Sequence, residues 1–186
     1  MIGVIGTLDP HQNERERQLL EEIREQGNTP KAARLFQDLI LSHYRAYGRD
    51  LPWRRTTDPY HILVSEIMLQ QTQVERVAVR YHEFLERFPD FESLARAPQS
   101  EVLLAWQGMG YNRRAISLQK TARLVVDEYG GNLPADVETL ATLPGIGQAT
   151  AAAICAYAFN MPVVYIETNI RRTFIHFFFQ DQKGVR

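Results

Sequence analysis

Residues 137–159 read VETLATLPGIGQATAAAICAYAF, and this stretch decides the fold. Apolar residues recur at helical spacing in residues 137–143, and the glycine-rich turn at residues 144–147 then interrupts that helix. Residues 148–159 have mostly small side chains, which predict a second helix that packs closely against its neighbour. The free N–H groups and the positive dipole end of this second helix lie at the turn. Because Gly145 and Gly147 can adopt positive φ and leave the backbone accessible, the turn is typical of a phosphate-binding site.

The glycine turn also has a bland interpretation, as an ordinary connection between two helices, because so short a motif often occurs by chance. The residues that follow favour the phosphate site. An extended segment at residues 162–166 leads to Glu167 and Asn169, where another helix starts. We therefore expect a polar cluster at a helix terminus a short distance from the turn.

Composition limits the class of protein. The 186 residues, 45% of them hydrophobic, suffice for one modest domain or two small lobes with a buried core. The net charge of −1 gives no overall basic field, although a local DNA site can rest on helix N-termini and a few arginines. The one cysteine, Cys155, excludes an internal disulfide framework and a four-cysteine cluster. No signal peptide or membrane span is predicted, so we expect a cytoplasmic protein, associated with the nucleoid in a prokaryote.

The two ends of the chain differ in character. Residues 1–29 are rich in Glu and Arg and predict a charged arm or an extra helix. Thr29 and Pro30 are typical of a helix start, so we predict a domain of residues 30–186 whose first helix ends near Tyr47. Residues 174–179 are rich in phenylalanine and too apolar for solvent. We expect either a chain that is incomplete at its C-terminus or an aromatic tail that needs a partner surface.

The second informative stretch is YHILVSEIMLQQTQV, residues 60–74, which predicts a buried helix. Glu66 lies in its middle, and apolar surroundings disfavour a charged carboxylate, as a general acid requires. The alternative is that Glu66 lies on a thin polar edge of the helix and pairs with an arginine. Gln70 and Gln71 at the helix end fit either solvated side chains or a wedge that fills the gap left by a flipped base.

Several motifs in this order resemble the adenine DNA glycosylases that act on A opposite oxidised G, the MutY type of the helix-hairpin-helix superfamily. The motifs are LPWR (51–54), DPY (58–60), SEIMLQQTQV (65–74), FP (88–89), WQGMGY (106–111), YGG (129–131) and LPGIG (143–147), followed by Asn169. Endonuclease III relatives share the scaffold but lack Glu66 and its paired glutamines. The resemblance implies an all-α helix-hairpin-helix glycosylase fold, with two helical lobes, the active site between them and the hairpin at residues 137–159.

The resemblance also implies a mechanism in which two carboxylates act on a glycosidic bond. Glu66 would protonate a ring nitrogen of adenine as the general acid. Glu167, oriented by Asn169, would stabilise the oxocarbenium character of the sugar.

Further positions match the family's contacts with DNA or the flipped base: Trp53, Arg54, Gln70, Gln71, Tyr111, Leu143, Gly145 and Gly147. Gln71 and Tyr111 would fill the void in the duplex, and Gln70 would hydrogen-bond beside them. Trp53 and Arg54 would form the wall of the adenine pocket. Without the resemblance, Trp53 would equally fit a side chain that packs its loop onto the core.

Three positions depart from the family pattern. Glu167, followed by Thr168, stands where the family has Asp followed by Gly, so it would act from a shifted backbone, act poorly or mark another substrate. Ala149 stands where bifunctional glycosylase/lyases carry a lysine, which excludes a Schiff base at that position. Asn112 replaces an aromatic residue that is frequent after the turn tyrosine.

These residues together predict a monofunctional, monomeric DNA glycosylase that removes adenine mispaired with G or 8-oxoguanine from double-stranded DNA. We expect no metal and no cofactor within residues 1–186, since an iron–sulfur cluster could be bound only by residues beyond 186. Two alternatives remain open. One is a non-catalytic helix-hairpin-helix DNA-binding relative, and the other is a glycosylase that removes a different mismatched base, such as a pyrimidine.

Overall fold

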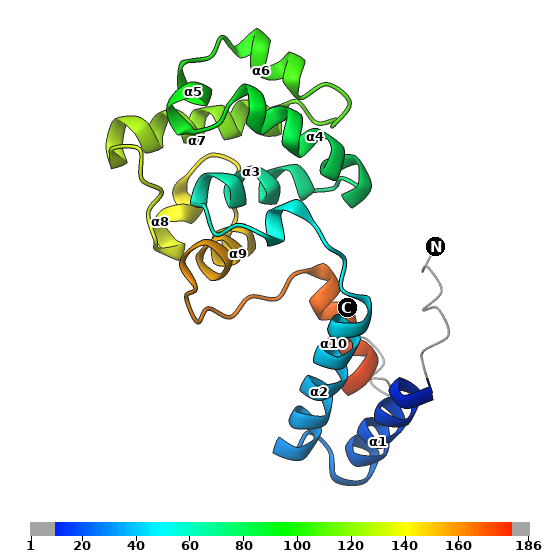
Figure 1. The fold of residues 1–186 in the computed structure, drawn as a ribbon. Helices are drawn as coiled ribbons and strands as arrows, with labels where there is room; N and C mark the ends of the chain where they lie inside the picture. Colours follow the sequence, from blue (N-terminus) through cyan, green and yellow to red (C-terminus); the bar gives the residue numbers. More distant parts are fainter. Residues whose placement is uncertain (1–9, 180–186) are drawn as a thin grey trace. The chain divides into compact units, whose positions relative to one another are not determined.

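The computed structural model describes residues 10–179, and these residues form ten α-helices and one short 3-10 helix, with no strand among them (Figure 1). They divide into two compact units. The central unit comprises residues 51–166, and the terminal unit comprises the described residues up to 50 and from 167 onward. The predicted domain boundary near residue 30 stays a prediction, because packing units and functional domains need not coincide.

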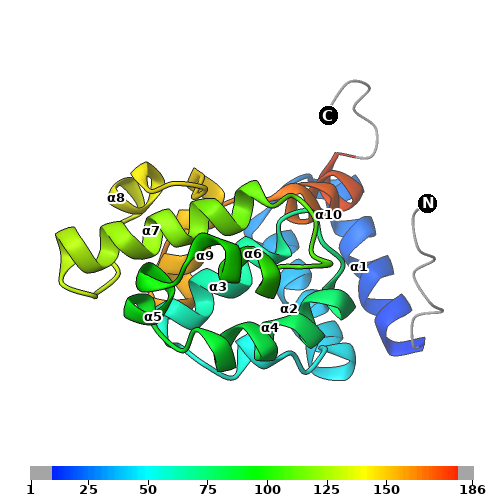
Figure 2. The ribbon, with the colours of Figure 1, turned by 90° about the horizontal axis from the view of Figure 1, so that it is seen from above.

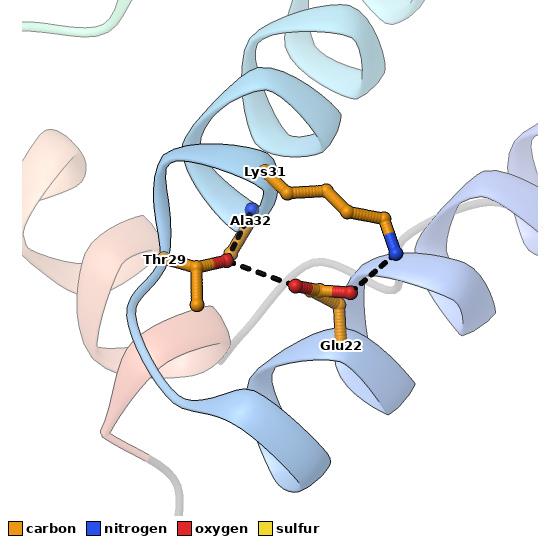
Figure 3. Close-up of polar contacts among 4 residues, drawn as sticks. All are labelled: Glu22, Thr29, Lys31 and Ala32. Atoms are coloured by element: carbon orange, nitrogen blue, oxygen red, sulfur yellow. Dashed lines mark hydrogen bonds and ion pairs between the residues drawn. The ribbon is translucent and has the colours of Figure 1, made fainter.

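The terminal unit contains α1 (Pro10–Gln26), α2 (Pro30–Tyr47) and α10 (Thr168–Phe178). The predicted start of α2 is confirmed, because Thr29 Oγ1 accepts a hydrogen bond from Ala32 N at 3.1 Å (Figure 3). The Thr29 hydroxyl also donates to Glu22 Oε1 of α1 at 2.9 Å, and Lys31 Nζ lies 2.6 Å from Glu22 Oε2. The hydrogen bond from Lys31, with a further one from Thr29, lowers the pKa of Glu22 below its ordinary value.

The phenylalanine-rich segment of α10 packs on α2. The Phe36 ring centroid lies 5.3 Å from Phe174, 5.5 Å from Phe177 and 5.2 Å from Phe178. These distances are typical of favourable aromatic pairs. Phe36 thus supplies a packing surface within the chain for part of the aromatic tail. Residues 180–186 lie outside the described part of the chain.

The central unit is built around α3 (Pro59–Leu69), whose apolar side chains are buried in the core. The elements around it are η1 (Pro52–Arg54), α4 (Val74–Arg87), α5 (Phe91–Arg96), α6 (Gln99–Ala105), α7 (Arg113–Tyr129), α8 (Val137–Thr142) and α9 (Gln148–Phe159). Helix α3 packs against α4, α7 and α9, and α7 packs along α5 and α6 (Figures 1 and 2). The all-α fold that the sequence predicted is confirmed.

The helix predicted at residues 60–74 ends at Leu69 in the structure, and residues 70–73 separate it from the next helix. Asp58 caps α3 by accepting a hydrogen bond from His61 N at 2.9 Å. The helix ends at Leu69, because Gln70 has a non-helical ψ of 110° and Gln71 adopts a left-handed conformation with φ 56°. A new helix, α4, starts at Val74. This break places Gln70 and Gln71 in a turn rather than within a helix.

The predicted hairpin is confirmed in α8, the glycine turn and α9. Asp136 caps α8 by accepting a hydrogen bond from Thr139 N at 2.7 Å. The small side chains of Ala151, Ala152 and Ala153 are buried, and α9 packs against both α3 and α8. Asn160 then ends α9 with a left-handed φ of 52°.

Candidate functional site

The glycine turn of the hairpin is held by helix α7. Gly145 has a φ of 83°, and a Cβ atom added to it would lie 2.8 Å from Cβ of Ser117 on α7. Glycine is therefore required at this position both by conformation and by space. On the same face of α7, Thr121 Oγ1 donates a hydrogen bond of 2.9 Å to the carbonyl oxygen of Pro144.

The second glycine of the turn behaves differently. Gly147 has φ −89°, so the positive φ considered for it in the sequence analysis does not occur, because it is the extended N-cap residue of α9. A Cβ atom at Gly147 would meet nothing within 4 Å. Among the described residues, no side chain caps the first turn of α9. The N-terminal end of α9 is thus open at Gly147, as a phosphate-binding turn requires.

Leu143 and Ala149 flank this turn. The Leu143 side chain is buried, so only its main chain is available for a contact with a ligand. Ala149 is exposed in the first turn of α9, beside a cavity of about 480 Å³ that α8, α9 and residues 163–166 line. The position at which a lysine would form a Schiff base is therefore accessible but carries a methyl group.

The candidate general acid, Glu66, lies on α3 and is half-buried between the buried residues Ser65 and Ile67. At the end of the same helix, the Gln70 amide Nε2 donates a hydrogen bond to the carbonyl oxygen of Gly145 at 3.2 Å. The helix that carries Glu66 is thereby connected to the glycine turn. No local pattern in the sequence predicted this bond.

Gln71 and Tyr111 share an uncommon backbone conformation. Gln71 has φ 56° and Tyr111 has φ 46°, and both side chains are exposed. The left-handed region costs roughly 1–2 kcal/mol for a residue with a Cβ atom. Such strain persists only where neighbouring groups hold it, and it concentrates at functional sites.

The neighbouring group is Arg114, a residue that the sequence analysis did not single out. Its Nη1 donates to the carbonyl oxygens of Ile67 at 3.1 Å, Met68 at 3.0 Å and Gln70. Its Nη2 donates to Thr72 Oγ1 at 3.0 Å. These acceptors surround the turn that carries Gln71.

The same Nη2 of Arg114 also donates to the carbonyl oxygens of Met109 at 2.9 Å and Gly110 at 3.2 Å, next to Tyr111. The guanidinium carbon lies 5.5 Å from the Trp106 ring centroid and 5.6 Å from that of Tyr111. Burial lowers the pKa of Arg114 below its ordinary value, yet an arginine remains protonated at neutral pH. One signal in the sequence was available, because a cation in the first turn of α7 opposes the helix dipole and calls for an explanation.

The glycine turn and the turns that carry Gln71 and Tyr111 all border one cavity of about 270 Å³. It is lined by Ile67, Gln70, Gln71, Tyr111, Arg113, Arg114, Ser117 and Gly145. Four of the candidate residues from the sequence analysis thus border one hollow in the central unit.

The candidate pocket residues Trp53 and Arg54 lie in η1. Trp53 is 7% exposed, and its ring packs edge-on against Tyr81 with centroids 5.5 Å apart. This packing supports the interpretation that the tryptophan fixes its loop on the core. Arg54 is exposed.

The candidate sugar-side residues Glu167 and Asn169 lie in the terminal unit. Glu167 is the N-cap of α10, and its Oε1 accepts a hydrogen bond from Ile170 N at 3.3 Å. Asn169 Nδ2 lies 3.5 Å from the other oxygen, Oε2. The sequence analysis placed both residues at a helix start but missed the capping bond.

No group of three or more His, Cys, Asp or Glu side chains between residues 10 and 179 is arranged to hold a metal ion. Cys155 is buried in α9, and burial raises the pKa of its thiol. A single buried thiol cannot hold an iron–sulfur cluster. None of the helices at residues 10–179 combines the length and apolar character of a membrane span.

The fold and the hairpin define a helix-hairpin-helix protein. The profile of the HhH-GPD superfamily base excision DNA repair proteins matches residues 64–185. The chain belongs to this superfamily, as its motifs predicted.

Relatives within the superfamily have two named activities. The chain is 46% identical over 134 residues to the adenine DNA glycosylase of Mycolicibacterium smegmatis, an alignment that covers 72% of this chain and 46% of that protein. It is 41% identical over 146 residues to the adenine DNA glycosylase of Homo sapiens, covering 74% and 27%. It is 34% identical over 151 residues to the thymine/uracil-DNA glycosylase of Methanothermobacter thermautotrophicus, covering 81% and 68%. The chain thus spans less than half the length of these adenine DNA glycosylases.

Solved structures agree with the fold. A thermostable thymine-DNA glycosylase superposes with a TM-score of 0.69 at 30% identity, covering 87% of this chain and 67% of that one. A trapped endonuclease III–DNA covalent intermediate superposes with a TM-score of 0.71 at 22% identity, covering 83% and 73%. The helix-hairpin-helix glycosylase fold is therefore confirmed.

Proposed function

We propose that this chain carries the catalytic machinery of a monofunctional DNA glycosylase that removes adenine mispaired with G or 8-oxoguanine. The observation that carries the proposal is the arrangement of α3. Its middle holds the half-buried Glu66, and its end, at Gln70, is hydrogen-bonded to the glycine turn at Gly145. A proton donor is thus connected through one helix to the turn that suits a DNA phosphate.

Glu66 is the proposed general acid. The adenine anion is a poor leaving group, so the glycosidic bond breaks only when a ring nitrogen of the base is protonated. The proton on the Glu66 carboxyl would go to that nitrogen, and the base would leave neutral. A half-buried position suits this role, because it leaves the carboxyl accessible to a base while the helix holds it in place.

Glu167 is the proposed sugar-side carboxylate. Departure of the base gives the sugar oxocarbenium character, which a nearby negative charge stabilises. Asn169, at 3.5 Å from Glu167 Oε2, would orient that carboxylate. The hydrogen bond from Ile170 N to the other oxygen holds the glutamate in one rotamer, which offsets part of the freedom of its extra methylene group.

The proposed partner is double-stranded DNA, which the protein would bind as a monomer. The open end of α9 at Gly147 would receive a phosphate, and the exposed side chains of Gln71 and Tyr111 would enter the duplex. Filling the gap offsets the cost of base extrusion, which is roughly a few kcal/mol. Because Ala149 has no amine, a water molecule rather than an enzyme lysine would attack the sugar.

Excision of thymine or uracil is the second candidate function. It is favoured by the similarity to the thymine/uracil-DNA glycosylase, of which the chain covers 68%. The adenine DNA glycosylase of Mycolicibacterium smegmatis is more similar in sequence, at 46% identity. The first candidate also accounts for Glu66, because a purine leaving group requires a proton donor.

The test is a single-turnover incubation with duplex DNA that carries A opposite 8-oxoguanine, A opposite G, T opposite G or U opposite G. Strand breaks that appear only after alkali, and only in the two duplexes with A, are the expected result. Breaks in the T·G or U·G duplex alone would replace the first candidate with the second. Binding of all four duplexes without cleavage by the wild-type chain would instead support the non-catalytic relative.

A further inference from the structure

We propose that Arg114 is a positioning residue: its guanidinium joins the turn that carries Gln71 to the turn that carries Tyr111 and holds both turns in the shape that engages DNA. The last step rests on the proposed function, in which Gln71 and Tyr111 enter the duplex. The joining of the two turns does not rest on it.

The hydrogen bonds of Arg114 are divided between the two turns. Four acceptors belong to residues 67–72 and two belong to residues 109–110, and all six are uncharged oxygen atoms. The remaining donor, Nε, is buried and has no partner among the described residues. Every hydrogen bond that the guanidinium makes therefore serves one turn or the other.

The end of α3 explains why a cation is suited to this position. The last carbonyl groups of a helix lack partners within the helix and carry the negative end of its dipole. The last turn of α3 contains no basic residue. Arg114, which lies 44 residues beyond Gln70 in the sequence, supplies the missing cation from α7.

The turn that carries Tyr111 is held by both Arg114 and Trp106. Trp106 Nε1 donates a hydrogen bond of 3.1 Å to the Gly110 carbonyl oxygen, which also accepts from Arg114. The Trp106 ring is fully buried and lies beneath the guanidinium. The backbone at Gly110, directly before Tyr111, is therefore fixed by hydrogen bonds. These neighbouring contacts maintain the left-handed φ of Tyr111, a conformation that a tyrosine rarely adopts.

A lysine at position 114 would keep the charge but not the geometry. The planar guanidinium presents two donor groups in a fixed fork, whereas an ammonium is a single point on a flexible stem. Arg114→Lys should therefore hold one turn at most. The matched control is Arg123→Lys, which makes the same chemical change on the same helix, where Arg123 Nε donates to the Ala95 carbonyl oxygen at 3.0 Å.

The experiment uses the 186-residue chain and three measurements. Amide hydrogen exchange in residues 68–73 and 108–112 reports the two turns. The fluorescence of 2-aminopurine, placed opposite 8-oxoguanine in a duplex, rises when that base unstacks and reports extrusion without requiring excision. Single-turnover excision of A opposite 8-oxoguanine reports the reaction.

For Arg114→Lys we expect faster exchange in both turns, a smaller fluorescence rise and excision slower by about tenfold or more, since small misplacements have large kinetic effects. Affinity for an undamaged duplex should change by less than about twofold, because the charge is retained. Arg123→Lys should match the wild type in all of these. Thr72→Val, which removes one acceptor, should accelerate exchange in residues 68–73 alone and keeps the test decisive if Arg114→Lys does not fold.

Unchanged exchange in either turn of Arg114→Lys or in residues 68–73 of Thr72→Val would overturn the proposal. So would faster exchange in both turns with unchanged fluorescence and, in an active enzyme, an unchanged excision rate. A wild-type chain that excises no base would count against the proposed function alone, since exchange and fluorescence still measure the role of Arg114.

Discussion

Gln70 and Gly145, which lie 75 residues apart in the sequence, are joined by a hydrogen bond of 3.2 Å from the Gln70 amide to the Gly145 carbonyl oxygen. The bond connects the end of α3 to the glycine turn between α8 and α9. It makes the position of the turn dependent on the helix that carries Glu66. A neutral amide suits this contact, because a carboxylate at position 70 would repel the carbonyl oxygen.

The Gln70–Gly145 bond can be tested by Gln70→Glu. The substitution keeps the side-chain length but removes the donor, so amide exchange in residues 144–148 should become faster. DNA affinity should fall as well, because the added charge lies close to the proposed phosphate site. Gln107→Glu, an exposed change in the same unit, controls for charge alone. Unchanged exchange at the turn in Gln70→Glu would show that the bond does not position it.

Glu66→Gln should abolish excision while preserving DNA affinity. A glutamine keeps the shape of the side chain but cannot donate the catalytic proton, and general acids contribute roughly 10²–10⁴-fold to rates. Single-turnover kinetics and equilibrium binding to an A·8-oxoguanine duplex measure the two effects. Glu86→Gln, an exposed change on α4, is the control. Joint loss of excision and of binding would indicate a structural role for Glu66.

The two glycines of the turn should respond in opposite ways to alanine. Gly145→Ala should destabilise the fold by about 1–2 kcal/mol or more, because φ is 83° and the new Cβ would lie 2.8 Å from Ser117. Gly147→Ala should leave stability within about 0.5 kcal/mol of wild type, because φ is negative and the space is empty. Its DNA affinity should nevertheless fall, because the methyl group would occupy the approach to α9. Thermal unfolding and DNA titration separate these outcomes. Unchanged DNA affinity in Gly147→Ala would show that no phosphate binds at Gly147.

Glu167→Asp should retain or raise excision. Aspartate matches the family pattern, and it is also a better N-cap residue than glutamate, so the start of α10 should be kept. Single-turnover rates of Glu167→Asp and Glu167→Gln measure the effect, with the amide variant expected to be much slower. If the aspartate variant loses its activity, the site requires the longer side chain of Glu167, and the analogy with the family fails at this residue.

The cap at Thr29 gives a prediction for pH. Because the folded protein lowers the pKa of Glu22, the charged carboxylate stabilises the fold above the ordinary glutamate range. That contribution is lost as the pH falls through the lowered pKa. The melting temperature of Glu22→Gln should therefore lie below that of the wild type at neutral pH, and the difference should shrink below about pH 4. A difference that is constant with pH would exclude the ionised carboxylate as its source.

The sequence by itself determined the helices and the hairpin. Their signals are local, because helical spacing, the capping side chains of Asp58 and Asp136 and the glycine turn act within a few residues. It also determined which side chains were candidates, since Glu66, Gln71, Tyr111 and the two glycines stand in motifs of fixed order.

Only the tertiary structure decided how those candidates are held. The acceptors of Arg114 lie up to 47 residues away, and the surface that covers the aromatic tail comes from Phe36 in another helix. Local pattern contains no information on such pairs, because a hydrogen bond between distant residues depends on where packing places their helices. The left-handed Gln71 lies in a turn whose oxygen atoms accept hydrogen bonds from Arg114, at least 42 residues away. The sequence supplied most of the candidate residues, whereas Arg114 and the geometry around α3 and α7 followed only from the packing.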